Sequence, residues 1–269
     1  MDLFSLPRLG VVVPPENPTA EPEFNRLIGA AMHVYTSRFP ITPGVELREM
    51  LETYNRVLPD TLDGFGGMRL DAAVVACSAS HYLLDPEGDL ALCEEMSNRS
   101  GFPVTSSTQA ILAACEALGV SRLTLVSPYQ PWLTDTSRAF WERAGLTVDG
   151  VVLVPAGRTA DGADHFDPYE VTTGRIRERI RAHQRESRLP DGSALLFTGT
   201  GMGTLGALGE LAREDTGGRP LLSSNLASAW WAWRATGRRT GAGFSGEVHP
   251  LLRRLDGAVR RPDRRRNAA

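Results

Sequence analysis

Short apolar segments alternate with longer amphipathic segments along almost the whole chain. The predicted strands span residues 9–13, 33–35, 72–76, 103–105, 123–127, 151–154, 194–198 and 221–222. The predicted helices span residues 21–31, 45–58, 89–98, 107–118, 133–144, 168–188, 205–213 and 226–236. Such alternation is typical of parallel sheets that helices cover on both faces. We therefore predict an α/β protein whose ligands bind beyond the carboxyl ends of the strands.

The chain contains two related halves. The segment Pro103-Val-Thr-Ser-Ser-Thr-Gln-Ala, which leads into a predicted helix, returns as Pro220-Leu-Leu-Ser-Ser-Asn-Leu-Ala before another predicted helix. In each copy a strand ends in Ser-Ser, and the first turn of the following helix could bind an anion. The alternative is that these serines are only helix caps.

A cysteine marks the same point in only one of the two halves. The apolar run 72–76 leads to Cys77, whereas the similar run 194–198 leads to Gly199. A thiol at the mouth of a buried strand is well placed to act as a nucleophile. An ordinary thiol pKa of ~8.5 leaves only a few per cent of it as thiolate at pH 7, so the thiol needs help from N–H dipoles or hydroxyls. The turn that begins at Ser78 could supply both.

His81, four residues after the thiol, is a candidate proton donor. The alternative is a histidine at a helix start that caps the helix or faces solvent. Cys93 and Cys115 lie within amphipathic segments, so we expect them to fill the core. Asn17 follows the first strand and can point its amide into the cleft, although Asn-Pro is also a common turn initiator.

Composition excludes several kinds of chemistry. The 269 residues carry a net charge of −3, which gives no general reason to expect a nucleic acid or an anionic membrane as partner. The chain contains no lysine, which excludes a lysine Schiff base and a phosphate-loop lysine. Its three cysteines form no Cys-x-x-Cys pair and no metal-ligand spacing with the five histidines. We therefore expect reduced thiols, no metal site and a cytoplasmic location, since no signal peptide or membrane span is apparent.

A glycine-rich segment, Gly201-Met-Gly203-Thr-Leu-Gly206, matches the dinucleotide pattern Gly-x-Gly-x-x-Gly between a strand and a helix. The next strand ends in Ser-Ser-Asn and offers no acidic residue for a ribose. A loop that holds a carboxylate or an oxyanion explains the same residues better.

Four motifs together resemble the aspartate/glutamate racemase superfamily, and within it the branch of maleate cis-trans isomerases and arylmalonate decarboxylases. They are Val-Pro-Pro-Glu-Asn-Pro-Thr at 13–19, Ala-Cys-Ser at 76–78, Ser-Pro-Tyr at 127–129 and Ser-Ser-Asn at 223–225. The similarity covers roughly residues 8–244. It implies two pseudosymmetric Rossmann-like (flavodoxin-like) lobes with parallel sheets, which enclose a small carboxylate in the cleft between them without metal or organic cofactor.

The resemblance also implies the lobe boundaries and a set of site residues. The first lobe is expected to span residues 1–115, completed by 222–255, and the second 116–221, with a disordered Arg-rich tail at 257–269. Cys77 matches the first-lobe cysteine of the isomerases and racemases, whereas Gly199 replaces the second. The residues expected to bind the substrate are Pro15, Asn17, Ser78, Ala79, Tyr129, Gly199, Thr200 and Gly201.

Three functions are compatible with these features. The leading hypothesis is a cis-trans isomerase of a maleate-like dicarboxylate, in which the Cys77 thiolate adds to the double bond. The second is an arylmalonate-type decarboxylase or racemase-like proton-transfer enzyme with Cys77 as the sole acid/base, because one thiol serves only one face of a carbon. The third is a carboxylate-binding module without catalysis. The expected partner is a small carboxylate, with no nucleic acid or membrane, and a homo-oligomer is possible.

Overall fold

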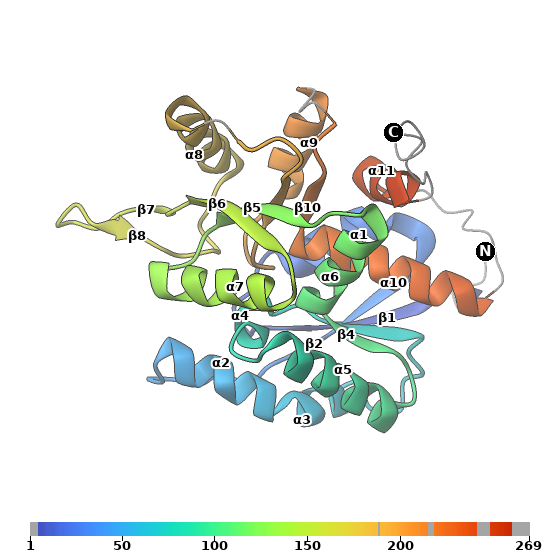
Figure 1. Ribbon diagram of the computed structural model, residues 1–269. Coiled ribbons are helices and arrows are strands. Elements are labelled where there is room, and N and C mark those ends of the chain that lie inside the picture. Colours follow the sequence, from blue (N-terminus) through green and yellow to red (C-terminus); the bar gives the residue numbers. More distant parts are fainter. Residues whose placement is uncertain (1–4, 188, 215–217, 241–247, 260–269) are drawn as a thin grey trace.

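The computed structural model describes residues 5–187, 189–214, 218–240 and 248–259, and contains two parallel sheets of four strands each (Figure 1). The first sheet has the order β2-β1-β3-β4. Its strands are β1 (Arg8–Val13), β2 (His33–Arg38), β3 (Ala72–Val75) and β4 (Val104–Ser106). The second sheet has the order β10-β9-β5-β6. Its strands are β5 (Arg122–Ser127), β6 (Thr147–Leu153), β9 (Ala194–Phe197) and β10 (Leu221–Ser223).

The two sheets have the same topology. In chain order, β5, β6, β9 and β10 take the places of β1, β2, β3 and β4, so both sheets read second-first-third-fourth. This is the order of flavodoxin-like sheets. The central strands β3 and β9 are buried along their whole length, as parallel strands covered on both faces require. The predicted fold class, α/β with two pseudosymmetric lobes, is confirmed.

Helices connect and cover the strands. Those of the first half are α1 (Ala20–Ile28), the 3₁₀ turn η2 (Gly29–Ala31), α2 (Leu47–Arg56), α3 (Leu58–Asp63), α4 (Ser78–His81), α5 (Pro86–Ser100) and α6 (Ser107–Leu118). Those of the second half are α7 (Pro131–Arg143), α8 (Thr173–Glu186), α9 (Leu205–Arg213), α10 (Ser224–Thr240) and α11 (Pro250–Val259). A small hairpin, β7 (Gly157–Arg158) and β8 (Asp164–His165), precedes α8 and projects from the body.

The helices that follow the last strand of each sheet hold the halves together. α6 and α10 pack against each other in the middle of the molecule, and α10 also contacts α1 and β3 of the first half. Residues after 223 thus return to the first sheet. This supports the lobe division inferred from the sequence, which we keep as a proposal.

Local signals explain where the structure departs from the predicted elements. The helix predicted from 168 begins only at Thr173, because Tyr169 N–H donates to Asp167 Oδ1 in a turn and Thr172 caps the helix. The helix predicted from 45 to 58 is two helices, with a break at Val57. The predicted tail at 257–269 is wrong for 257–259, which lie in α11, and its remainder lies outside the described residues.

Among the residues that the structure describes, no helix combines the length and the apolar character that crossing a bilayer requires.

Candidate active site

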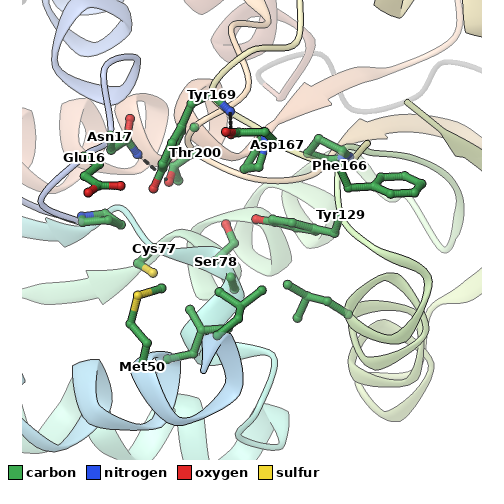
Figure 2. Close-up of a pocket in the computed structure, with 18 of the residues that line it drawn as sticks. Glu16, Asn17, Met50, Cys77, Ser78, Tyr129, Phe166, Asp167, Tyr169 and Thr200 are labelled. Carbon is green, nitrogen blue, oxygen red and sulfur yellow. Dashed lines mark hydrogen bonds between the residues drawn. The ribbon is translucent and has the colours of Figure 1, made fainter. Parts of the chain in front are cut away.

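The carboxyl ends of the strands from both sheets face a common cavity of about 260 Å³ (Figure 2). Its walls are polar on the side of the strand ends and apolar on the side of α2 and α7. The residues that line it are Pro14, Glu16, Asn17, Leu47, Met50, Leu51, Tyr54, Cys77, Ser78, Ala79, Pro128, Tyr129, Gln130, Leu133, Phe166, Asp167, Pro168, Tyr169, Thr200 and Gly201. Both halves contribute, so the cavity lies between the sheets.

Cys77 lies between β3 and the short helix α4, and its side chain is directed into the cavity. Only 3% of the residue is exposed. Burial raises the pKa of the Cys77 thiol, against the opposing effect of hydrogen bonds from Ser80 and from the Ala79 amide. At neutral pH the cavity therefore contains a protonated thiol, together with amides that can receive a thiolate when one forms.

Tyr129 fills the place where the second half would carry its own thiol. Gly199 follows β9 at the offset that Cys77 has after β3, with a φ of 89° that favours glycine. A Cβ on Gly199 would lie 2.7 Å from the Tyr129 hydroxyl oxygen and 3.1 Å from its Cζ. Residue 199 thus has no room for a side chain while Tyr129 keeps this position. Gly199 itself does not line the cavity.

Tyr169 lies over Gly201 in a similar way. A Cβ on Gly201 would lie 2.4 Å from Cε1 of the Tyr169 ring. Gly206, the last glycine of the dinucleotide-like pattern, faces Thr173 Oγ1, at 2.6 Å from its notional Cβ. Close packing against Tyr169 and Thr173 thus explains two glycines of the pattern by steric need.

Asn17 links the two halves at the edge of the cavity. Its Oδ1 accepts hydrogen bonds from the amides of Thr19 and Ala20, and its Nδ2 donates to Thr200 Oγ1 at 3.3 Å. Thr200 Oγ1 in turn donates to Ala76 O at 2.6 Å. Asn17 thus organises the turn and also lines the cavity, and its role as a carboxylate binder stays a prediction that the remaining N–H of its amide could serve.

The two Ser-Ser segments meet at Ser78. Ser78 Oγ lies 2.9 Å from Ser107 Oγ and 3.1 Å from Ser224 Oγ, at the starts of α6 and α10. Ser106 and Ser223 accept from amides in the first turns of these helices. The serines are thus caps and parts of a buried network, so the expected anion site at either helix is not supported. Ser78 lines the cavity, with its hydroxyl already engaged.

His81 does not line the cavity. It is fully buried, and its Nδ1 lies 2.6 Å from Asp89 Oδ1. Asp89 also accepts from Ser106, Thr108 and Gln109. His81 therefore neither lines the cavity, as a proton donor would, nor faces solvent. The pair instead anchors α4, the helix that starts beside Cys77.

Of the other predicted residues, Ala79, Thr200 and Gly201 line the cavity, and Pro15 does not. The Pro15 carbonyl accepts from Arg38, which fixes the loop before Asn17. Cys93 and Cys115 are buried outside the cavity, as expected of core residues.

Several lining residues were missed in the sequence. Leu47, Met50, Leu51 and Tyr54 of α2 repeat at helical spacing, which is a core signal that does not distinguish a core from a cavity wall. The segment 166–169 was assigned to a helix or left without a role. Among these missed residues, only Glu16 could have been predicted, because it adjoins Asn17 in the Val-Pro-Pro-Glu-Asn-Pro-Thr motif.

The cavity contains no cation of its own: no lining residue in the described part of the chain is Arg, Lys or His, whereas Glu16 and Asp167 are acidic. Burial, with smaller contributions from Cys77 and Glu16, raises the pKa of Tyr54 to about 12. A bound carboxylate would therefore rely on neutral donors, namely amides, hydroxyls and the Asn17 amide.

His165, Asp167 and Glu170, near the mouth of the cavity, offer ligand atoms within 4.8 Å of one another. His165 Nε2 and Glu170 Oε2 already form a pair at 3.5 Å, and both residues are exposed.

Fold and site together define a two-lobed α/β protein with one buried thiol in the cleft between its sheets. Comparison with known proteins identifies the family. The family model for arylmalonate decarboxylase matches residues 9–248, so the chain belongs to the arylmalonate decarboxylase family, as its motifs indicated. The chain is 27% identical over 243 residues to the arylmalonate decarboxylase of Bordetella bronchiseptica, a match that covers 88% of this chain and 93% of that protein.

Solved structures with the same fold include both activities of the predicted branch. A liganded arylmalonate decarboxylase variant, with one glycine changed to cysteine and one cysteine to serine, superposes with a TM-score of 0.72 at 22% identity, covering 93% of this chain and 98% of that one. The Nocardia farcinica maleate cis-trans isomerase, as a cysteine-to-serine variant with a covalently bound succinylcysteine intermediate, gives 0.69 at 23% identity, covering 86% and 92%. The protein thus belongs to a family of enzymes.

Proposed function

We propose that the protein is a decarboxylase of malonates that carry an apolar substituent, with Cys77 as the proton donor. The observation that carries the proposal is the state of this thiol. It is buried, its pKa is raised by that burial, and Tyr129 rather than a second thiol lies on the opposite side of the cavity. A protonated thiol with access to one face of a carbon suits single-face protonation. Membership of the arylmalonate decarboxylase family supports the same choice.

The apolar wall defines the substrate class. Leu47, Met50 and Leu51 of α2 and Leu133 of α7 contribute apolar side chains to the cavity wall. Figure 2 shows Met50 on the side away from Asn17 and Thr200. Such a wall accepts an alkyl or aryl substituent, whereas a carboxylate placed against it would be buried without a partner. Maleate carries a carboxylate on each alkene carbon and no apolar substituent, so it leaves this wall without a partner.

The reaction proceeds in two steps. The bond between the α-carbon and one carboxylate breaks, CO₂ leaves, and the electron pair enters the remaining carboxylate as an enediolate. Neutral donors around it, the Asn17 amide and the Tyr129 hydroxyl among them, stabilise the developing charge. The Cys77 S–H proton then passes to the α-carbon. The resulting thiolate is held by Ser80 and the Ala79 amide until solvent reprotonates it.

Maleate isomerisation, the leading hypothesis from the sequence, is the second candidate. A related fold supports it, because the Nocardia farcinica isomerase has been captured with a succinylcysteine. It requires a nucleophilic thiolate at rest, and burial of Cys77 opposes ionisation. Decarboxylation requires a protonated Cys77 and isomerisation requires its thiolate, so experiments can distinguish the two candidate functions.

The test compares phenylmalonate, a methyl-substituted phenylmalonate and maleate as substrates for wild type, Cys77→Ser and Cys115→Ala. CO₂ release from the malonates by wild type and Cys115→Ala, but not by Cys77→Ser, is expected. Fumarate formation without CO₂ release would overturn the proposal in favour of isomerisation. Thermal stabilisation by these acids with no chemical change would indicate the binding module.

A further inference from the structure

Tyr129 occupies a position that only a glycine at residue 199 permits. The hydroxyl and Cζ of the tyrosine lie 2.7 and 3.1 Å from the place of a Cβ at that residue. These are distances that a real side chain could not keep without displacing the ring. Gly203, in the same loop, has no atom within 4 Å of its notional Cβ. The crowding at residue 199 therefore comes mainly from Tyr129, and it adds to the positive φ of Gly199, which disfavours a side chain by itself.

The Tyr129 ring is fixed from behind. Its amide donates to Ser127 Oγ at 3.3 Å, and its carbonyl accepts from Thr134 Oγ1 at 3.1 Å. The ring meets Tyr82 edge to face at 6.4 Å, and Tyr82 packs in turn against Phe140 and Trp141 at 5.6 Å each. Only 8% of Tyr129 is exposed. Two hydrogen bonds thus fix the backbone of Tyr129, and the edge-to-face contact with Tyr82 supports its ring, so the ring has little freedom to leave the cavity wall.

Tyr129 and Cys77 approach the cavity from opposite sides. Figure 2 shows the ring entering from the side of the second sheet, with its hydroxyl directed toward the cavity, whereas the thiol enters from the side of β3. A substrate carbon between them has the thiol on one face and the phenol ring on the other. In the symmetric fold, that second face is the one that a thiol at residue 199 would serve.

We infer that Tyr129 determines the handedness of the product by covering the face of the enediolate opposite Cys77, so that solvent water cannot protonate it there. This inference rests on the proposed decarboxylation. Protonation by water on the covered face would give the opposite enantiomer of the product and leave hydroxide. On the open face, Cys77 S–H supplies the same proton and becomes a thiolate. A ring that excludes water from one face leaves only the second route.

The experiment measures the enantiomeric composition of the product from α-methyl-α-phenylmalonate, a prochiral substrate. Wild type is expected to give one enantiomer. Tyr129→Phe keeps the ring and loses the hydroxyl, so the rate should fall on the order of 10²-fold while the product stays single-handed. Tyr129→Ala opens the face, so the product should move toward an even mixture. Gly199→Ala, which displaces the ring, should shift it in the same direction, and Gly203→Ala should not.

A single-handed product from an active Tyr129→Ala variant would overturn the inference. If no malonate is turned over, the proposed function fails, and the contact between Tyr129 and residue 199 can still be tested without substrate. The loss of Tm caused by Gly199→Ala should be smaller in a Tyr129→Ala background than in wild type, because the clashing ring is gone. An equal loss in both backgrounds would mean that the two residues do not contact, and would also overturn the inference.

Discussion

The loop after β3 and the loop after β9 occupy equivalent places in two sheets of identical strand order, yet they are built differently. After β3 the chain passes through Cys77 directly into the short helix α4, whose first amides contact the thiol. After β9 it passes through a glycine-rich loop before α9 begins at Leu205. The first loop carries its own reactive group. The second makes room for Tyr129 and Tyr169, which other segments supply.

This difference shows how a symmetric fold gives an asymmetric site. The backbone framework is duplicated, but the chemistry depends on which side chains fill the space around each strand end. A glycine at 199 is not only a missing cysteine, because it is what allows Tyr129 to face the cavity.

The largest effect is expected from Cys77→Ser. The reactive group of the first loop is replaced by a hydroxyl that is a far weaker acid. Turnover should fall by roughly 10²–10⁴-fold, the usual contribution of a positioned acid. The measurement is CO₂ release, with circular dichroism to verify folding. Cys115→Ala, which changes a buried thiol in α6, is the matched control, and comparable loss in both variants would argue against a special role for Cys77.

The pH dependence of turnover comes next. Burial raises the pKa of the Cys77 thiol above its ordinary value. A reaction that uses the protonated thiol should therefore stay active beyond the ordinary thiol pKa of about 8.5 and decline only as pH rises through the raised value. A reaction that uses the thiolate should instead increase over this range. A rising profile that Cys77→Ser abolishes would reverse our assignment of the thiol as an acid.

Glu23→Ala should remove the hydrogen bonds that join the loop after β9 to helix α1 of the first lobe. The buried Glu23 carboxylate of α1 accepts from the amides of Thr204 and Leu205 and from Asn225 Nδ2. Its removal leaves these donors unpaired, so the free energy of unfolding should drop by about 3 kcal/mol. Denaturant unfolding measures this, with Arg26→Ala on the exposed side of α1 as control. Equal stability of the two variants would contradict the role of Glu23 as a link between the halves.

Burial also raises the pKa of Glu23, against the opposing hydrogen bonds from Asn225, Leu205 and Thr204. Because the folded pKa lies above the unfolded one, the resulting stabilisation is present below the unfolded pKa and is lost as pH rises through the folded value. Wild type should therefore lose more stability than Glu23→Ala over this rise in pH.

Gly201→Ala should have a smaller effect, confined to the second loop. The new methyl group would overlap the Tyr169 ring, and overpacking of this kind costs about 1–2 kcal/mol when a side chain can move aside. The KM for the malonate should rise with little loss of folding, because Tyr169 lines the cavity. Gly203→Ala is again the control. Unchanged kinetics in both variants would mean that the position of Tyr169 does not matter.

The smallest effect is expected from Arg48→Gln. The guanidinium of Arg48 in α2 lies 4.9 Å from the centre of the Trp132 ring in α7, which bridges the two halves near the cavity mouth. An exposed cation–π contact contributes about 0.5–1 kcal/mol. Thermal unfolding should show a small decrease in Tm, and Arg56→Gln at the end of the same helix serves as comparison. A decrease of several kcal/mol in the free energy of unfolding would contradict this prediction, because an exposed contact of this kind contributes much less.

Much of this protein was determined by local sequence alone. Apolar runs bounded by turn residues fix the eight principal strands, and the repeated Pro-x-x-Ser-Ser segment reveals the duplication, because both are short-range patterns. Cys77, Asn17, Ser78 and Thr200 could be placed near one another for the same reason, since carboxyl ends of parallel strands meet at one edge.

Only the tertiary structure decided how these residues act. The sequence could not show that Ser107 and Ser224 meet at Ser78, that His81 pairs with Asp89, or that Tyr129 takes the space above Gly199, because each of these contacts joins segments that are distant in sequence or depends on the direction of one side chain. The protonation state of Cys77 likewise could not be predicted from the sequence. Its residue type follows from the sequence, whereas its pKa follows from the burial that the packed lobes impose.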